Sequence, residues 1–199
     1  MEDGLRMERT MKRGEFEYIK NRKKKVLTLL LVYMLAAAGI YVLGLVLNEM
    51  SRRNIFTVIS ILFVLPWAKQ LVAMIVLFPH HSVSAERYQR VAGMVPEGVT
   101  LLTDAVISSP DKIMSLDFVV IAPGQVVGLV TAGTKDLGYI RNYLSQGVKN
   151  WGTGYHVKLV DSEKLFMAEL GALTEPGEQT PQQMEEYENV VSYLETLIV

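Results

Sequence analysis

The sequence contains no cysteine and only three histidines among its 199 residues. The absence of cysteine excludes a disulfide framework, a thiolate metal site and a thiol nucleophile. His156 is the sole histidine after residue 81, so no Ser–His–Asp set can be proposed for the C-terminal part of the chain. A glycine-rich phosphate loop of the P-loop or dinucleotide type is also missing. We therefore expect no cofactor, and these absences favour a protein that is not an enzyme.

Acidic and basic residues are unevenly distributed, although the net charge is only −1. Nine Lys/Arg and five Asp/Glu lie in residues 1–25, whereas eight Lys/Arg and fifteen Asp/Glu lie in residues 84–199. Proteins that bind nucleic acid depend on Lys and Arg to contact phosphates. The acidic C-terminal part therefore argues against a nucleic-acid partner and favours a protein partner with basic patches.

Half of the residues are hydrophobic, and the N-terminal part of the chain holds two long apolar runs. Residues 26–47 contain no charge and would extend about 33 Å as a helix, enough to cross a hydrocarbon core of about 30 Å. Residues 55–78 are also long enough, but they contain Pro66 and Lys69. The short connector predicts a two-helix transmembrane hairpin over residues 26–78. A cleavable signal peptide is the competing interpretation, but the first run ends without a small-residue cleavage site.

The orientation of this hairpin follows from the basic residues that flank it. Nine Lys/Arg precede the first run, whereas the connector contains only Arg52 and Arg53. An excess of Lys and Arg marks the cytoplasmic side of a span. We therefore expect a multi-pass protein of the cell membrane with both termini in the cytoplasm, a basic cytosolic segment at residues 1–25 and a cytosolic domain at residues 84–199. The lipid bilayer is one partner, and the basic residues at its interface are Arg22, Lys23, Lys24 and Lys25.

Lys69 and Gln70 are polar residues inside the second apolar run. Lys69 could bind an anion or pair with a carboxylate in an oligomer, which would suit a transport component. The alternative is that Pro66 weakens the helix locally and Lys69 reaches water or the headgroups. The small residues 36–39 in the first run allow close helix packing. They could serve the two spans of one chain or self-association.

The remaining residues predict a small α/β domain with a mixed sheet of about four strands flanked by helices. Pro, Gly and polar residues separate its segments, and β-branched residues concentrate in the expected strands. The expected helices are 84–95, 134–151 and 184–197, and the expected strands are 99–109, 112–122, 126–131 and 155–160. Residues 162–173 are either helical or extended, and residues 174–183 are a polar linker. The strands at 112–122 and 126–131 are continuously apolar, which indicates a sheet covered on both faces.

An aspartate-led strand, a Pro-Gly turn and a second apolar strand make up LDFVVIAPGQVV, and a helix follows. This arrangement at about residues 100–160 resembles nuclease-related (NERD) domains of the restriction-endonuclease-like fold. The resemblance implies an acidic residue on the first strand, matched by Asp117, and a Glu-x-Lys pair on the second. That strand reads VVGLVTAG and contains neither residue. Asp104 on the preceding strand could add a carboxylate, and two acids could hold Mg²⁺ loosely.

The sequence therefore leaves three functions open. The first is a membrane protein whose acidic, non-catalytic cytosolic domain acts as a docking or regulatory module for a protein partner or through self-association. The second is a membrane-tethered, metal-dependent nuclease with Asp104 and Asp117 as its candidate catalytic residues. The third is an oligomeric transport component that uses Lys69. The bulk of the sequence evidence favours the first.

Overall fold

A computed structural model describes residues 12–47, 55–134, 136–173 and 175–199. The described chain divides into two compact units. One unit is helical and covers Ile19–His81. The other covers Ser82–Val199 together with the residues up to Tyr18, and it contains a four-stranded mixed sheet with helices. The predicted class of mixed helix and sheet, α/β in the α+β sense with a mixed sheet of about four strands, is confirmed.

The helical unit is built from the two apolar runs. Its helices are α1 (Tyr18–Leu47), α2 (Ile55–Leu62) and α3 (Val64–Leu77). The helix of the first run begins eight residues before the predicted start, because the preceding Lys and Arg residues are good helix formers. The second run is interrupted at Phe63, since Pro66 has no amide hydrogen to donate to the carbonyl of Leu62. By length and hydropathy, Tyr18–Leu47 and Ile55–Leu77 could each cross a membrane.

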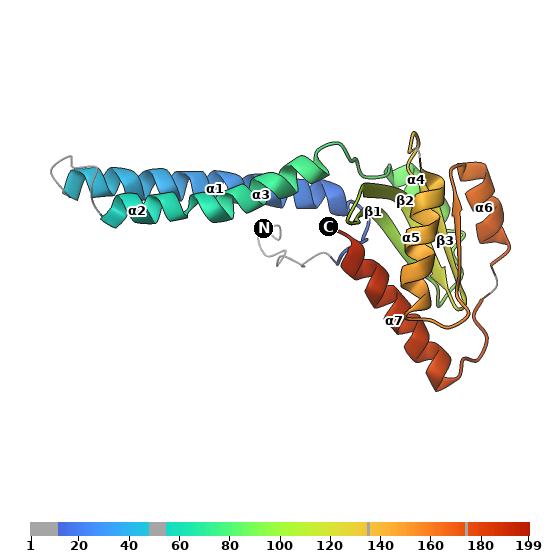
Figure 1. Ribbon diagram of the computed structural model, residues 1–199. Helices are drawn as coiled ribbons and strands as arrows, with labels where there is room; N and C mark the ends of the chain where they lie inside the picture. Colours follow the sequence, from blue (N-terminus) through green and yellow to red (C-terminus); the bar gives the residue numbers. More distant parts are fainter. Residues whose placement is uncertain (1–11, 48–54, 135, 174) are drawn as a thin grey trace, which may run out of the picture. The chain divides into compact units, whose positions relative to one another are not determined.

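The helices of this unit lie side by side (Figure 1). The hydroxyl of Ser60 on α2 donates a hydrogen bond of 2.8 Å to the carbonyl of Ala37 on α1. Nearby, the rings of Tyr33 and Phe63 meet edge to face with centroids 6.5 Å apart. The small-residue segment therefore contacts the second run at Ala37. Gly39 has no neighbouring atom within 4 Å of an added Cβ.

The second unit is organised around a sheet with the strand order β1-β2-β3-β4. Its strands are β1 (Thr100–Ser108), β2 (Ile113–Ala122), β3 (Gln125–Val130) and β4 (His156–Val160). The first two pairings are antiparallel, whereas β3 and β4 are parallel. Parallel neighbours require a crossover, and the helix α5 (Leu137–Lys149) provides it.

Helices cover both faces of this sheet (Figure 1). On one face, α5 and α7 (Pro181–Leu197) bury apolar side chains against β1–β4. On the other face lie α4 (Ala85–Ala92) and α6 (Glu163–Gly171), where the rings of Phe118 and Phe166 stack at 5.9 Å. Burial on both faces explains why the central strands are continuously apolar, as the sequence predicted.

Two details of the helices differ from the prediction. The last helix begins at Pro181 rather than at residue 184, because Thr180 and Gln183 form a reciprocal capping box. The helix expected over residues 134–151 is shorter, because α5 covers Leu137–Lys149, and Trp151 beyond its end is 50 % exposed. Its ring stacks instead on Tyr193 of α7, with centroids 6.0 Å apart.

The outer edge of β1 is covered by segments from near both ends of the chain. The amide of Thr103 donates to the carbonyl of Gly14 at 2.7 Å, and the amide of Val199 donates to the carbonyl of Val106 at 3.0 Å. Gly14 has a φ of 80°, and a Cβ there would lie 2.9 Å from the side chain of Leu102. Residues 12–18, which were expected to belong to a basic N-terminal segment, therefore pack as part of the domain.

Candidate functional site

The two candidate acidic residues lie opposite each other in the sheet. The register pairs Thr103 with Phe118 and Ala105 with Leu116, so positions 104 and 117 face each other across β1 and β2. Both positions are irregular. Asp104 has a φ of 54°, and the pairing of β2 with β3 shifts register between residues 116 and 118. Bulges of this kind redirect a side chain out of the regular alternation.

Asp117 is held by contacts to both of its oxygens. The guanidinium of Arg87 lies 2.9 Å from Oδ2, and the hydroxyl of Thr131 donates to Oδ1 at 2.6 Å. Arg87 also pairs with Glu163 at 2.9 Å and lies 5.5 Å from the ring centre of Phe118. The side chain of Asp117 is only 14 % exposed, so this ion pair is largely shielded from water. Contact with these two carboxylates raises the pKa of Arg87 despite its partial burial.

Asp104 is one of two buried polar residues in the described chain, with 2 % of its surface exposed. Its Oδ1 accepts a hydrogen bond of 2.9 Å from the backbone amide of Val83. Val83 and Arg87 flank Ser84, which caps the N-terminus of α4. The two aspartates therefore hold one short segment, residues 83–87, against the sheet.

Asp104 and Asp117 thus contact other residues of the same domain. A divalent cation at Asp117 would compete with Arg87 and Thr131, which already contact its two carboxylate oxygens. Within the part of the chain that the structure describes, no three His, Cys, Asp or Glu residues gather as a metal-binding group. The geometry of Asp104 and Asp117 therefore fits the positioning of α4 better than metal-assisted hydrolysis.

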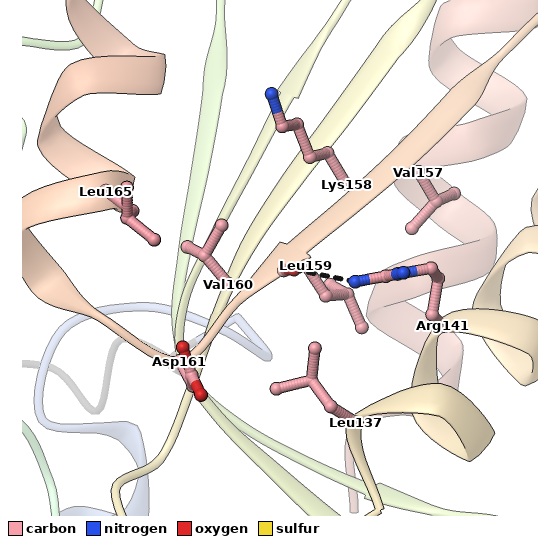
Figure 2. Close-up of a pocket in the computed structure, with 8 residues that line it drawn as sticks. All are labelled: Leu137, Arg141, Val157, Lys158, Leu159, Val160, Asp161 and Leu165. Atoms are coloured by element: carbon pink, nitrogen blue, oxygen red, sulfur yellow. Dashed lines mark hydrogen bonds between the residues drawn. The ribbon is translucent and has the colours of Figure 1, made fainter.

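A groove follows the outer edge of β4, and Figure 2 shows its lining between α5 and α6. Its volume is about 480 Å³. We call it the β4 groove, and it is lined by Leu137, Arg141, Val157, Lys158, Leu159, Val160, Asp161 and Leu165. Among the described residues, no strand pairs with the outer edge of β4, whereas the edge of β1 carries an isolated bridge between Ile107 and Ile198.

Every second residue of β4 directs its backbone amide and carbonyl toward this groove. The amide of His156 donates inward, to the carbonyl of Gly124 at 2.9 Å. In a parallel pairing the next residue directs its amide and carbonyl to the opposite side, so Val157 and Leu159 face the groove. Arg141 of α5 donates to the carbonyl of Leu159 at 3.3 Å, as the dashed line in Figure 2 shows.

The side chains that flank the groove are apolar and charged. Leu165 of α6 is 54 % exposed, and Leu137 of α5 is partly exposed on the other side. Lys158 forms an ion pair with Glu169 at 2.6 Å. No ion pair of Arg141 with a carboxylate is found among the described residues, and its hydrogen bond there is to a backbone carbonyl.

The polar and basic residues that the sequence singled out in the helical unit are exposed or partly buried. Lys69 is exposed on α3, Gln70 beside it is partly buried, and neither α1 nor the α2–α3 run contains an acidic residue. Among the basic residues, Lys24 and Lys25 are exposed and Arg22 is partly buried. These positions are compatible with contacts to water or lipid headgroups.

Lys23 has a role that the sequence did not indicate. Its ammonium donates to the carbonyl of Phe78 at 3.0 Å and to the carbonyl of His80, both just beyond the end of α3. Carbonyls at a helix C-terminus are left without intrahelical donors, so a lysine is a favourable partner there. Partial burial lowers the pKa of the nearby His80, and the charges of Lys23 and His81 lower it further.

Comparisons of the chain with protein-family models, curated proteins and solved structures find no match. Sequence reasoning identified Asp104 and Asp117 but missed the β4 groove. One signal was present, because residues 155–160 alternate between apolar and polar whereas the central strands do not. Alternation with a lysine on an otherwise apolar sheet is typical of an edge strand.

Proposed function

We propose that this chain is a two-span membrane protein whose acidic cytosolic domain is a docking module rather than an enzyme. The helices α1, α2 and α3 support the membrane part of this proposal. Large apolar side chains such as Leu35, Val46 and Leu65 are each about two-thirds exposed, at 66–71 %. Exposed apolar surface of this extent is unfavourable in water and favourable in lipid.

Contacts within the domain support the proposal that the chain enters and leaves the membrane on the same side. Residues 12–17 precede α1, and Ser82 follows α3, yet both belong to the same compact unit. Gly14 pairs with β1 and the ring of Phe16 stacks on Tyr88 of α4 at 4.4 Å. A chain that leaves this unit and returns to it must cross the membrane an even number of times. The basic residues before the first span favour the cytoplasm as that side.

The observation that carries the docking proposal is the difference between the two sheet edges. The chain covers the edge of β1 with its own backbone, whereas the edge of β4 borders a groove with exposed apolar and charged side chains. Proteins normally cover or protect an exposed edge, because it can pair with another chain. An uncovered edge with a lined groove is suited to binding.

Site-specific photo-crosslinking in intact membranes tests this function. Crosslinking residues are placed at three domain positions of similar exposure, Leu165, Trp151 and Met184, and at Leu35 on α1 as the membrane control. We expect at least one domain position to form a discrete protein adduct that Leu35 does not form. Adducts from Leu35 alone would overturn the docking proposal. Metal-dependent nuclease activity of the full chain that disappears in Asp117→Ala would overturn the non-catalytic part.

A further inference from the structure

We propose that the β4 groove binds an extended segment of a partner polypeptide as an added strand, with an aspartate or glutamate of that segment paired to Arg141. This inference rests on the proposed docking function and specifies its ligand. The partner is defined by two features of the groove. One is the row of outward backbone groups on β4, and the other is the cation beside Leu159.

The backbone of β4 determines the form of the ligand. Val157 and Leu159 direct amide and carbonyl groups outward at alternating positions, which is the pattern that an extended backbone can match. Binding of a peptide to a sheet edge uses these main-chain hydrogen bonds for affinity and alternate side chains for specificity. Helices α5 and α6 flank the edge on opposite faces of the sheet (Figure 2). The groove of about 480 Å³ runs along the edge and is lined from both helices as well as from β4.

Arg141 determines the charge of the ligand. An incoming strand would take over the carbonyl of Leu159, which currently accepts a hydrogen bond of 3.3 Å from this arginine. The released guanidinium would then need a new acceptor, and no carboxylate of the described residues pairs with it. A carboxylate provides a stronger, charge-assisted bond and fits the two-pronged donor geometry of arginine.

The faces of β4 fix where that carboxylate must lie. Val157 and Leu159 pack toward α5, whereas Val160 belongs to the cluster on the α6 side. Lys158 pairs with Glu169 of α6, so the even-numbered positions face that helix. The acidic residue of the ligand therefore lies on its α5-facing side, between apolar residues two positions away that contact Leu137 and Val157.

The test uses the full chain in lipid nanodiscs and a labelled heptapeptide of the sequence Thr-Val-Thr-Glu-Thr-Val-Thr. In this peptide Val, Glu and Val share one face. Fluorescence anisotropy measures its affinity for wild type, for Arg141→Gln and for Arg90→Gln, a control at an exposed arginine outside the groove. We expect saturable binding to wild type, weakened about fivefold or more by Arg141→Gln, as for loss of one charged hydrogen bond. Arg90→Gln should leave the affinity within about twofold.

Two altered peptides separate this mode from adventitious binding. Replacing the glutamate with glutamine should remove the difference between wild type and Arg141→Gln. Methylating alternate backbone amides should abolish binding, because it blocks strand pairing. Undetectable binding of the glutamate peptide, equal affinity for Arg141→Gln, or full binding of the methylated peptide would each overturn the proposal.

Two further measurements address whether loss of folding explains a variant's loss of binding and whether a second copy of the chain occupies the β4 groove. Hydrogen exchange on wild type should slow at the amides of Val157 and Leu159 when the peptide is added, and protection confined to other elements would contradict the proposal. A Leu165→Cys variant of the otherwise cysteine-free chain should not form a disulfide-linked dimer, and a dimer that excludes the peptide would also contradict it. Photo-crosslinks from Trp151 or Met184 alone would leave docking intact while rejecting this groove.

Discussion

Arg87 is the residue on which the contacts around Asp117 depend. Its guanidinium reaches Asp117 and Glu163, each at 2.9 Å, and thereby joins α4 to β2 and α6. The aspartate is 14 % exposed, so it cannot recover full hydration if its partner is removed. Breaking an ion pair in such a place is costly because one charge stays behind without compensation.

Replacing Arg87 with methionine should therefore destabilise the domain. We expect a loss of about 1–3 kcal/mol in the free energy of unfolding, the range for a shielded polar group that loses its partner. Arg90→Met is the matched control, because Arg90 is 53 % exposed and pairs with Glu86 and Glu163 near the surface. It should cost less than about 1 kcal/mol. Urea denaturation of the full chain in nanodiscs measures both, and equal losses would contradict this account.

His80 should make the end of the helical unit sensitive to acid. Its pKa is lowered from the ordinary value of 6.5 by burial and then by Lys23 and His81. The folded state therefore binds this proton less tightly than the unfolded chain. The free energy of unfolding should fall as pH decreases below 6.5 toward the lowered pKa, and it should be unaffected by His80 well above 6.5.

Two measurements check this pH dependence. An NMR titration should give His80 an apparent pKa below 6.5, and Lys23→Met should move it partly back, because burial remains as the larger cause. Thermal unfolding between about pH 7.5 and 5.5 should then show a smaller loss of stability in His80→Gln than in wild type. The explanation fails if His80 titrates at or above 6.5.

At the scale of elements, α5 shows how one helix can contain two glycines with opposite requirements. A Cβ at Gly147 would lie 1.8 Å from the hydroxyl oxygen and 2.6 Å from the ring of Tyr193 on α7. A Cβ at Gly138 would meet no atom within 4 Å. The first glycine lets α5 and α7 approach each other, whereas the second lies in open space near the start of the helix.

Alanine substitutions should separate these roles. Gly138→Ala should stabilise the domain by up to about 1 kcal/mol, because alanine has the higher helix propensity. Gly147→Ala gains the same propensity but must displace Tyr193, so we expect a net loss of about 1–3 kcal/mol, as in overpacked cores. Thermal denaturation measures both. A second substitution, Tyr193→Ala, should remove the difference between the two glycine sites, and its persistence would refute the steric cause.

Elements could be predicted where the local pattern determines them. The strands β1, β2 and β3 were predicted within one residue at their ends, because continuous apolar runs are bounded by Pro, Gly and Ser. The contacts of the candidate site could be predicted less well from the sequence. Asp104 and Asp117 were identified, but their contacts with Val83 and Arg87 depend on where α4 packs. The β4 groove depends on strand order and on two helices from different parts of the chain, which no local pattern specifies.

At the scale of the whole molecule, the proposed topology predicts which positions reach each side of the membrane. The chain contains no cysteine, so single cysteines can be labelled without background. Ser51→Cys in the connector should react with an impermeant maleimide added outside intact cells. Met184→Cys, at an exposed position on α7, should react only after permeabilisation. The reverse pattern would invert the orientation and place the domain outside the cell.

The contact of residues 12–18 with β1 has a consequence for biosynthesis. The hydrogen bonds that join Gly14 to Thr103 link positions 89 residues apart, and the two candidate membrane spans lie between them. Gly14 leaves the ribosome long before β1 does, so under the proposed topology this stretch stays at the cytoplasmic face while the two candidate spans insert. Residues 12–18 would then cover the edge of β1 only after insertion has succeeded. A fragment that starts after the second candidate span would leave that edge exposed and would be prone to aggregate.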